Sequence, residues 1–256
     1  MRADSGRLLL LGGNRYNLPG IRSAREAGFR ILLADRNPDA PGLKEAHLGC
    51  PIDLFDTERL LAAVHDFGGV DGVVSMSEVG VRQAALLARC LGLPSITQKA
   101  AANATSKVAM RRLWAEAGGY SIDWCVVRSV EAALGAADRL GGYPLIFKPD
   151  RSYGGSRGVR RVNSRSEAVE AFQFASSAAM DGVDVVVEPF LTGSEHSAEV
   201  MVVDRRASVI CVGDNVKSPF PFRVNLSIRY PSYFEAGIMT EVENMCQAAV
   251  TALGID

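Results

Sequence analysis

Short apolar runs alternate with amphipathic segments along the first hundred residues. The apolar runs predict buried strands, and the segments with apolar residues every three to four positions predict helices. Strands are expected at residues 7–11, 30–34 and 72–75, and helices at 21–27, 57–67 and 79–91. Because strands separated by helices form parallel sheets with right-handed crossovers, this part of the chain is expected to have a Rossmann-like α/β arrangement.

The spacing of the apolar positions changes beyond residue 104, and the next block has the size of a small α+β unit with its own sheet. Helices are expected at 105–117, 130–140, 166–177 and 241–253, and strands at 122–128, 143–148, 159–163, 184–188, 197–203 and 207–212. The last two strands flank Asp204-Arg205-Arg206, which is typical of a turn and predicts an antiparallel pair.

These patterns divide the chain into four parts. They are a parallel-sheet domain at 1–95, linking helices at 96–121, a small α+β subdomain at 122–188 and the beginning of a further subdomain at 189–256. Ser106 is the expected N-cap of the helix at 105–117. The sequence stops directly after an expected helix, where a compact domain would continue with a strand. We therefore expect it to be part of a longer polypeptide, with a natural short protein as the alternative.

The charges are balanced, with 28 Lys and Arg against 29 Asp and Glu. Such a surface provides no basic field for nucleic acid or an anionic membrane, so neither partner is expected. The apolar run at 8–11 ends at Gly12, whereas a secretory signal needs roughly 7–15 apolar residues and a membrane span about 20. Five dispersed cysteines without a CxxC pair and three scattered histidines predict neither a disulfide framework nor a zinc site. A cytoplasmic protein is therefore expected.

A glycine turn, Gly12-Gly13-Asn14, follows the first expected strand, where a dinucleotide fold would place its phosphate loop. Asp35 follows the second strand, where an acidic residue could hold a ribose. A nicotinamide oxidoreductase is thus one alternative. The next glycine is Gly20, however, so the GxGxxG spacing of such a fold is absent. We interpret the turn as a structural or acceptor-substrate loop.

A second glycine-rich stretch, at 151–158, follows a strand that ends in Lys148. Glycine and serine at this density let backbone N–H groups converge on an anion. A lysine that closes a buried strand beside such a loop indicates a fixed positive charge for phosphate. The lysine precedes the glycines, so this is not a Walker sequence. Considered alone, the segment could also be a mobile surface hairpin.

Two glutamates lie further along the chain. Glu188 ends an expected strand of three valines and is followed by Pro189-Phe190-Leu191, which could form a flat apolar pocket suited to a purine. Glu195 follows seven residues later, within reach of a sugar hydroxyl. Taken singly, each glutamate is more often a solvated surface charge.

Together these segments resemble the ATP-grasp superfamily, in particular its biotin-carboxylase-like members and its carboxylate–amine (L-amino-acid) ligases. The resemblance covers nearly the whole chain and rests on the order and spacing of four segments. These are Ser106-Lys107-Val108-Ala109-Met110-Arg111, Phe147-Lys148-Pro149, Gly154-Gly155-Ser156-Arg157-Gly158-Val159 and Glu188-Pro189-Phe190-Leu191-Thr192-Gly193-Ser194-Glu195. The resemblance implies a pre-ATP-grasp domain, then an ATP-grasp lid, then the start of the large ATP-grasp subdomain.

The resemblance also implies an ATP site. Lys107 and Lys148 correspond to the two lysines that hold the ATP phosphates. The flexible lid over the phosphates corresponds to a loop that includes Gly154, Gly155, Ser156 and Gly158.

The same resemblance implies the nucleoside contacts. Glu188 corresponds to the carboxylate that accepts a hydrogen bond from the adenine amino group. The Pro189 carbonyl and the Leu191 amide border the base, and Glu195 binds the ribose hydroxyls.

The reaction that this resemblance implies begins with attack of a carboxylate on the γ-phosphate of ATP, which gives an acyl phosphate and ADP. An amine then displaces the phosphate, so we expect an ATP-dependent ligase for small-molecule carboxylates and amines, such as amino acids or peptides. This chemistry needs positioning and charge neutralisation more than a nucleophilic side chain. The alternatives are a catalytically incomplete nucleotide-binding or assembly module and a biotin-carboxylase-type carboxylation.

Mg²⁺ is the cofactor that the resemblance implies beside ATP. Its ligands in the family, an acidic residue and a later Glu-x-Asn, belong to strands after the point where this sequence stops. No metal ligand is therefore assigned within the chain, and the chain alone is expected to be inactive.

The acceptor substrate is less well specified. Amino-acid ligases often carry a Glu and a His where this chain has Asn225 and Ile228. Asn225 and Arg229 are the candidate substrate residues, and Arg223 and Arg229 could bind a substrate carboxylate through bidentate hydrogen bonds, with surface placement as the alternative. Dimerisation is common in the family, so a homodimer is an open alternative to a monomer.

Overall fold

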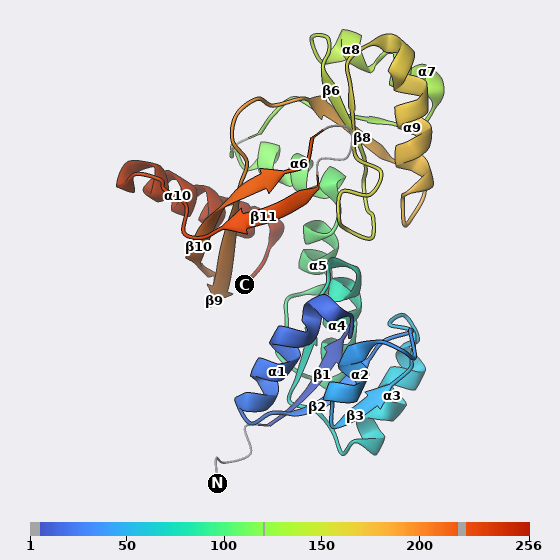
Figure 1. Cartoon of the computed structure of the whole chain (residues 1–256), viewed down its shortest axis with the longest axis vertical. Coiled ribbons are helices and arrows are strands. Elements are labelled where there is room, and N and C mark those ends of the chain that lie inside the picture. The colour runs from blue at the N-terminus through green and yellow to red at the C-terminus, as the bar shows by residue number, and fades with distance from the viewer. Residues whose placement is uncertain (1–5, 120, 220–223) are drawn as a thin grey trace. The chain divides into compact units, whose positions relative to one another are not determined.

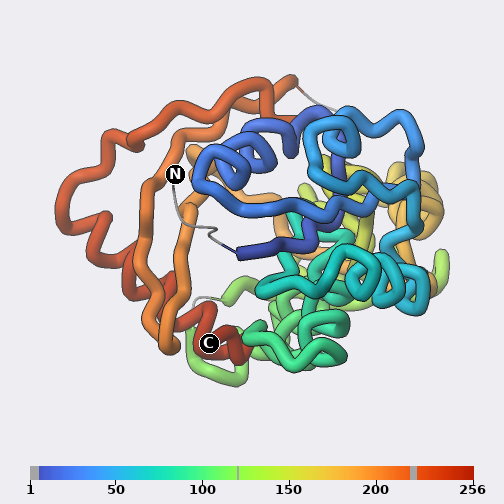
Figure 2. Tube along the Cα trace, turned by 90° about the horizontal axis from the view of Figure 1, so that it is seen from below, coloured from blue at the N-terminus to red at the C-terminus, as the bar shows by residue number. Residues whose placement is uncertain are grey.

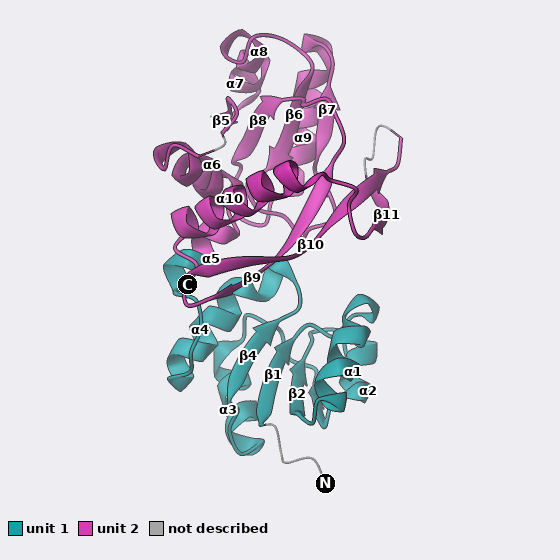
Figure 3. Cartoon of the chain, turned by 90° about the vertical axis from the view of Figure 1, so that its left-hand side faces the viewer, with its two compact units in different colours: residues 1–101 teal, residues 102–256 magenta. Residues whose placement is uncertain are grey.

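The computed structural model describes residues 6–119, 121–219 and 224–256. It divides into two compact units, Met1–Ala101 and Ala102–Asp256, and the boundary falls within helix α5 (Gln98–Ala104) (Figure 3). Arg223, a candidate for a substrate carboxylate, lies outside the described residues. The finer division into four parts remains a prediction.

The first unit is built on a parallel four-stranded sheet in the order β3-β2-β1-β4. The strands are β1 (Arg7–Leu11), β2 (Arg30–Ala34), β3 (Leu48–Cys50) and β4 (Gly72–Ser75). The helices are η1 (Arg15–Asn17), α1 (Leu18–Glu26), α2 (Pro41–Glu45), α3 (Thr57–Asp66), η2 (Glu78–Gly80) and α4 (Val81–Leu91).

Both faces of this sheet are covered by helices. Alternate residues of β1 enter two separate cores, Leu9 with Leu60 of α3 on one face and Leu10 with Ile21 of α1 on the other. Burial on both faces explains why the strands are continuous apolar runs rather than alternating ones. The strands expected at 7–11, 30–34 and 72–75 and the α/β fold class are confirmed.

The second unit contains an antiparallel four-stranded sheet in the order β5-β8-β6-β7. Its strands are β5 (Cys125–Val127), β6 (Leu145–Pro149), β7 (Arg160–Val162) and β8 (Val185–Pro189). The helices of this part are α6 (Lys107–Glu116), α7 (Val130–Leu134), α8 (Ala136–Arg139), η3 (Arg165–Glu167) and α9 (Ala168–Ser177). The single helix expected at 130–140 was wrong, because Gly135 separates α7 from α8.

One face of this sheet forms a core with α7 and α9 (Figure 1). Phe147 of β6 and Val187 of β8 enter that core and are fully buried. Because side chains alternate along a strand, Lys148 and Glu188 must point to the opposite face. The strand pairing places Lys148 opposite Val186, two residues from Glu188. The fold therefore brings an ammonium and a carboxylate together on the open face of the sheet.

A three-stranded antiparallel sheet in the order β11-β10-β9 completes the second unit. It consists of β9 (His196–Val203), β10 (Arg206–Lys217) and β11 (Asn225–Arg229), and helix α10 (Ala236–Leu253) follows it. β9 and β10 form a long hairpin (Figure 2). Asp204 and Arg205 have φ values of 49° and 65° at its turn, which confirms the expected antiparallel pair.

Candidate functional site

Glu188 lies at the centre of a cluster of cations in the second unit. The residue is 8% exposed, and its carboxylate contacts two of them. Oε1 accepts a hydrogen bond from Lys148 Nζ. Oε2 accepts from Arg111 of α6, with distances of 3.0 Å from Nε and 2.9 Å from the terminal nitrogen. Burying these charges costs desolvation free energy, which their mutual attraction offsets only with good geometry and further hydrogen bonds.

Lys107 joins the cluster through the loop that follows β6. Its Nζ donates to the carbonyl oxygen of Asp150 at 3.1 Å. The Asp150 carboxylate accepts from Ser106 Oγ and from the Val108 amide, each at 2.8 Å. Asp150 thus fastens the first turn of α6 to the end of β6. The two lysines that the sequence selected lie in one neighbourhood for this reason, and Asp150 is a contributor that sequence reasoning missed.

The N-cap of α6 provides a direct test of this arrangement. Ser106 accepts from the Ala109 amide, as Ser129 of α7 accepts from the Ala132 amide. Each serine-to-alanine substitution is expected to lower the free energy of unfolding by about 1 kcal/mol, since each removes one cap. Only Ser106→Ala should also weaken phosphate binding, because it removes the hydroxyl contact to the Asp150 carboxylate and leaves only the Val108 amide. Urea unfolding and titration with tripolyphosphate measure the two effects, and equal phosphate affinities of the two variants would contradict the role of Asp150.

Burial lowers the pKa of the Lys148 ammonium below its ordinary value of 10.5. Glu188 attracts the charge and opposes this shift, whereas Arg111 and Lys107 repel it and add to the shift. The lowered pKa indicates that the positive charge of Lys148 is incompletely compensated. An incoming anion would stabilise it.

This shift makes stability depend on pH with a definite sign. The folded state binds fewer protons at Lys148 than the unfolded state does once the pH passes the lowered pKa. The free energy of unfolding contributed by this group therefore rises as the pH increases toward 10.5. Lys148→Met removes that rise, so the stability advantage of wild type over the variant should grow across the alkaline range. Urea unfolding at a series of pH values measures it, and a constant difference would contradict the assignment.

A cleft of about 230 Å³ opens beside the Lys148–Glu188 pair. Six of the residues selected from the sequence line it, namely Lys148, Ser156, Glu188, Pro189, Leu191 and Glu195. Ile146 and Phe190 supply apolar wall, and the guanidinium of Arg161 lies 4.3 Å from the centre of the Phe190 ring. The cleft thus combines cations, a carboxylate and a flat apolar wall, which are the features that a nucleotide requires.

Lys217 also lines this cleft, although the sequence assigned it no role in the site. Its side chain is 13% exposed, and Nζ lies 2.5 Å from Glu195 Oε1. The Asn215 side chain donates to the same oxygen at 3.3 Å. Lys217 reaches the cleft because β10 continues to residue 217, five residues beyond the expected end of that strand.

The glycines of the loop at 154–158 differ in what they require. Gly158 has a φ of 75°, and a Cβ atom there would lie 2.7 Å from the Ala178 Cβ, so only glycine fits. Gly155 has open space around it, and both Gly154 and Gly155 have positive φ. The loop is therefore anchored at Gly158 and unobstructed at Gly155.

The candidate substrate residues lie apart from the cleft lining. Asn225 and Arg229 are the end residues of β11, and both are exposed. Asn225 is paired with Lys217 in the sheet, which places its backbone one strand away from a residue of the cleft.

The Gly12-Gly13 turn of the first unit has a structural role. The Gly13 amide donates to the Asp35 carboxylate at 2.7 Å, and a Cβ at Gly13 would lie 2.7 Å from a Leu33 methyl carbon. Asp35 therefore supports the turn instead of facing a ribose. This geometry agrees with the interpretation of a structural loop and supplies no dinucleotide site.

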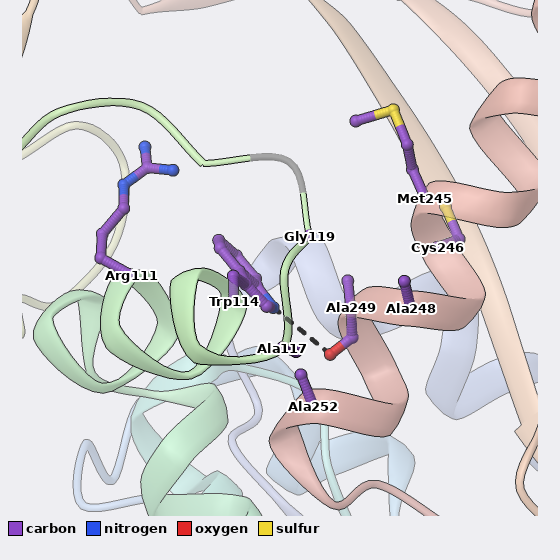
Figure 4. Close-up of a pocket in the computed structure, with 9 residues that line it drawn as sticks. All are labelled: Arg111, Trp114, Ala117, Gly119, Met245, Cys246, Ala248, Ala249 and Ala252. Carbon is purple, nitrogen blue, oxygen red and sulfur yellow. Dashed lines mark hydrogen bonds between the residues drawn. The ribbon is translucent and has the colours of Figure 1, made fainter.

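A second hollow in the second unit, of about 290 Å³, lies between α6 and α10. Trp114, Ala249 and Ala252 line it, and the indole nitrogen of Trp114 donates to the Ala249 carbonyl at 3.3 Å (Figure 4). Its lining is mostly apolar, and the Arg111 side chain points away from α10 (Figure 4). We therefore place the site for a charged ligand in the cleft beside Glu188 and not in this larger hollow.

Two family models match the chain. Residues 21–95 match the ATP-grasp N-terminal domain, and residues 105–231 match the Carbamoyl-phosphate synthase L chain, ATP binding domain. The chain belongs to the ATP-grasp superfamily, and its second unit contains the ATP-binding domain.

Curated relatives include formate-dependent phosphoribosylglycinamide formyltransferases. The protein from Burkholderia thailandensis is 28% identical over 189 residues, which cover 72% of this chain and 46% of the relative. The protein from Stenotrophomonas maltophilia strain K279a is 28% identical over 187 residues, which cover 72% and 47%. The chain thus spans about half the length of the curated relatives it matches.

Solved structures share the fold over almost the whole chain. An L-amino acid ligase from Bacillus licheniformis matches with a TM-score of 0.81 and 24% identity, covering 99% of this chain and 61% of that one. An N5-carboxyaminoimidazole synthetase from Staphylococcus aureus, complexed with ADP, matches with a TM-score of 0.81 and 17% identity, covering 97% and 63%.

Proposed function

We propose that this chain is the ATP-binding part of a ligase that activates a small-molecule carboxylate as an acyl phosphate and joins it to an amine. The observation that carries the proposal is the convergence of Lys148, Glu188 and Glu195 on one cleft, with Lys107 beside it. The curated relatives, the N5-carboxyaminoimidazole synthetase and the L-amino acid ligase are named for reactions on small molecules, which supports this class of substrate. We place the reaction in the cytoplasm.

In the proposed reaction a carboxylate oxygen attacks the γ-phosphorus of ATP. A carboxylate O–P bond forms, the β–γ bridging bond breaks, and ADP leaves. The amine nitrogen then attacks the acyl carbon, phosphate leaves, and the nitrogen loses a proton. Lys107 and Lys148 would neutralise the phosphate oxygens, which is the main requirement of phosphoryl transfer. Closure of the loop around Gly155 would exclude water from the acyl phosphate.

Mg²⁺ is proposed to accompany ATP. Within residues 6–119, 121–219 and 224–256, no group of three or more His, Cys, Asp or Glu side chains is placed to hold a metal ion. No residue of the chain is assigned to Mg²⁺, and no step is routed through it. In the same ranges no helix combines the length and the apolar character that crossing a membrane requires.

The product nucleotide tests the proposal. The complete protein is incubated with ATP and a panel of carboxylates and amines, and nucleotides are separated by chromatography. Release of ADP and phosphate that depends on both a carboxylate and an amine is the expected result. Release of AMP and pyrophosphate would contradict acyl phosphate formation.

A further inference from the structure

The two oxygens of Glu188 are divided between two cations of different kinds. Lys148 holds Oε1, and Arg111 holds Oε2 alone, through two N–H groups. The side chains of Arg111, Lys148 and Glu188 are 20%, 16% and 10% exposed, so water screens these contacts weakly. A change at one oxygen can therefore leave the other contact intact.

We propose that Arg111 is a positioning residue that retains Glu188 when a nucleotide takes Lys148 away from it. This inference rests on the proposed function. In the free protein Glu188 is bound by both cations. In the nucleotide complex Lys148 binds phosphate, Arg111 remains on Oε2, and Oε1 becomes the acceptor for the exocyclic amino group of the base. The exchange couples phosphate binding to base recognition.

Arg111 is suited to this task because its guanidinium also contacts a side chain of its own helix. It lies one helical turn after Lys107 on α6, and its guanidinium is 5.9 Å from the centre of the Trp114 ring. Arginine does not lose its proton in proteins, so its contact with Glu188 Oε2 stays charge-assisted whichever partner Lys148 has. Lys107 is not a substitute, since its ammonium is bonded to the Asp150 carbonyl.

The charges explain why the exchange needs Arg111. Lys148 is drawn to Glu188 and repelled by Arg111 and Lys107. Removing Arg111 leaves the buried carboxylate dependent on Lys148 alone, which strengthens its hold on that ammonium. Phosphate would then have to compete with Glu188 for Lys148, and Oε1 would not be released to the base.

The test compares ATP, ITP and tripolyphosphate binding by calorimetry in Arg111→Met, Glu188→Gln, the double variant and wild type. ITP carries a carbonyl oxygen in place of the 6-amino group, so the ATP-to-ITP ratio reports on Oε1. Arg111→Met should weaken tripolyphosphate roughly tenfold and reduce the preference for ATP over ITP. Glu188→Gln in that background should restore tripolyphosphate affinity, because a neutral amide does not hold Lys148, without restoring the preference.

The matched control is Arg112→Met. Arg112 is the neighbouring arginine on α6, is 61% exposed and pairs with Glu116 at 4.0 Å, so all three affinities should stay at wild-type values. If Arg111→Met does not fold, Arg111→Gln keeps a donor without the charge and carries the same expectations.

Three results would overturn the proposal. Wild-type affinities in Arg111→Met would show that Arg111 has no part in binding. If Arg111→Met lowered tripolyphosphate affinity equally in the wild-type and in the Glu188→Gln background, Arg111 would be identified as a direct phosphate ligand. The third result is a wild type that binds no ATP, which would overturn the proposed function together with this inference. ATP binding by wild type therefore separates the first two results from failure of the proposed function.

Discussion

Replacing Lys148 with methionine is expected to lower ATP affinity by roughly a hundredfold, the largest effect on binding of any single substitution in the cleft. Methionine keeps the length of the buried stem and removes the charge. The variant keeps the contact between Arg111 and Glu188 but loses the ammonium that paired with the other carboxylate oxygen. Calorimetric titration with ATP and with tripolyphosphate measures the loss, which should be similar for the two ligands.

The control for this prediction is Lys44→Met. Lys44 is an exposed lysine of α2 in the first unit, so its removal changes the net charge equally without touching the cleft. A Lys148→Met variant that binds ATP as tightly as Lys44→Met would remove the phosphate role from Lys148, and with it the main support for the ATP site.

Replacing Phe147 with alanine is expected to lower the free energy of unfolding by about 3–5 kcal/mol, the largest expected effect on stability. Phe147 is fully buried in the core between β6 and the helices α7 and α9. Its removal leaves a cavity directly behind Lys148, because adjacent residues of a strand point to opposite faces. Nucleotide affinity should therefore fall as well, through displacement of β6.

Phe174→Ala is the matched control for the core substitution. Phe174 belongs to α9 but is 47% exposed, so the same change of side chain should cost far less. Urea unfolding of the two variants measures the difference. Equal losses of stability would contradict the claim that burial in the core determines the cost of removing Phe147.

The sequence predicted elements best where burial makes the pattern continuous. The apolar runs of β1 and β2 are buried on both faces, and their limits coincide with the expected strands. β3 is only Leu48-Gly49-Cys50, too short for any periodicity, and it forms by pairing with β2. β11 was also missed. All of its residues are exposed, so no buried face marks it in the sequence.

The site was predictable only as far as residue order allows. Lys107, Lys148 and Glu188 follow from the spacing of motifs, and the structure places them together, while their roles remain predictions. Arg111 could not be assigned a partner from the sequence, since its contact with Glu188 links positions 77 residues apart and depends on α6 lying against the open face of the sheet. Arg111 closes one of the segments that carry the family resemblance, but that segment alone gave it no partner.

The contact between Arg111 and Trp114 provides an intrinsic fluorescence probe of the site. The chain has two tryptophans, and the indole of Trp114 lies beside the guanidinium on one side and the Ala249 carbonyl on the other. A cation near an indole ring perturbs its excited state, so emission from Trp114 should respond when the charges around Arg111 are rearranged. Ligand binding at the cleft can thus be followed by intrinsic fluorescence without a label, and Trp124 supplies a background that Trp114→Phe would isolate.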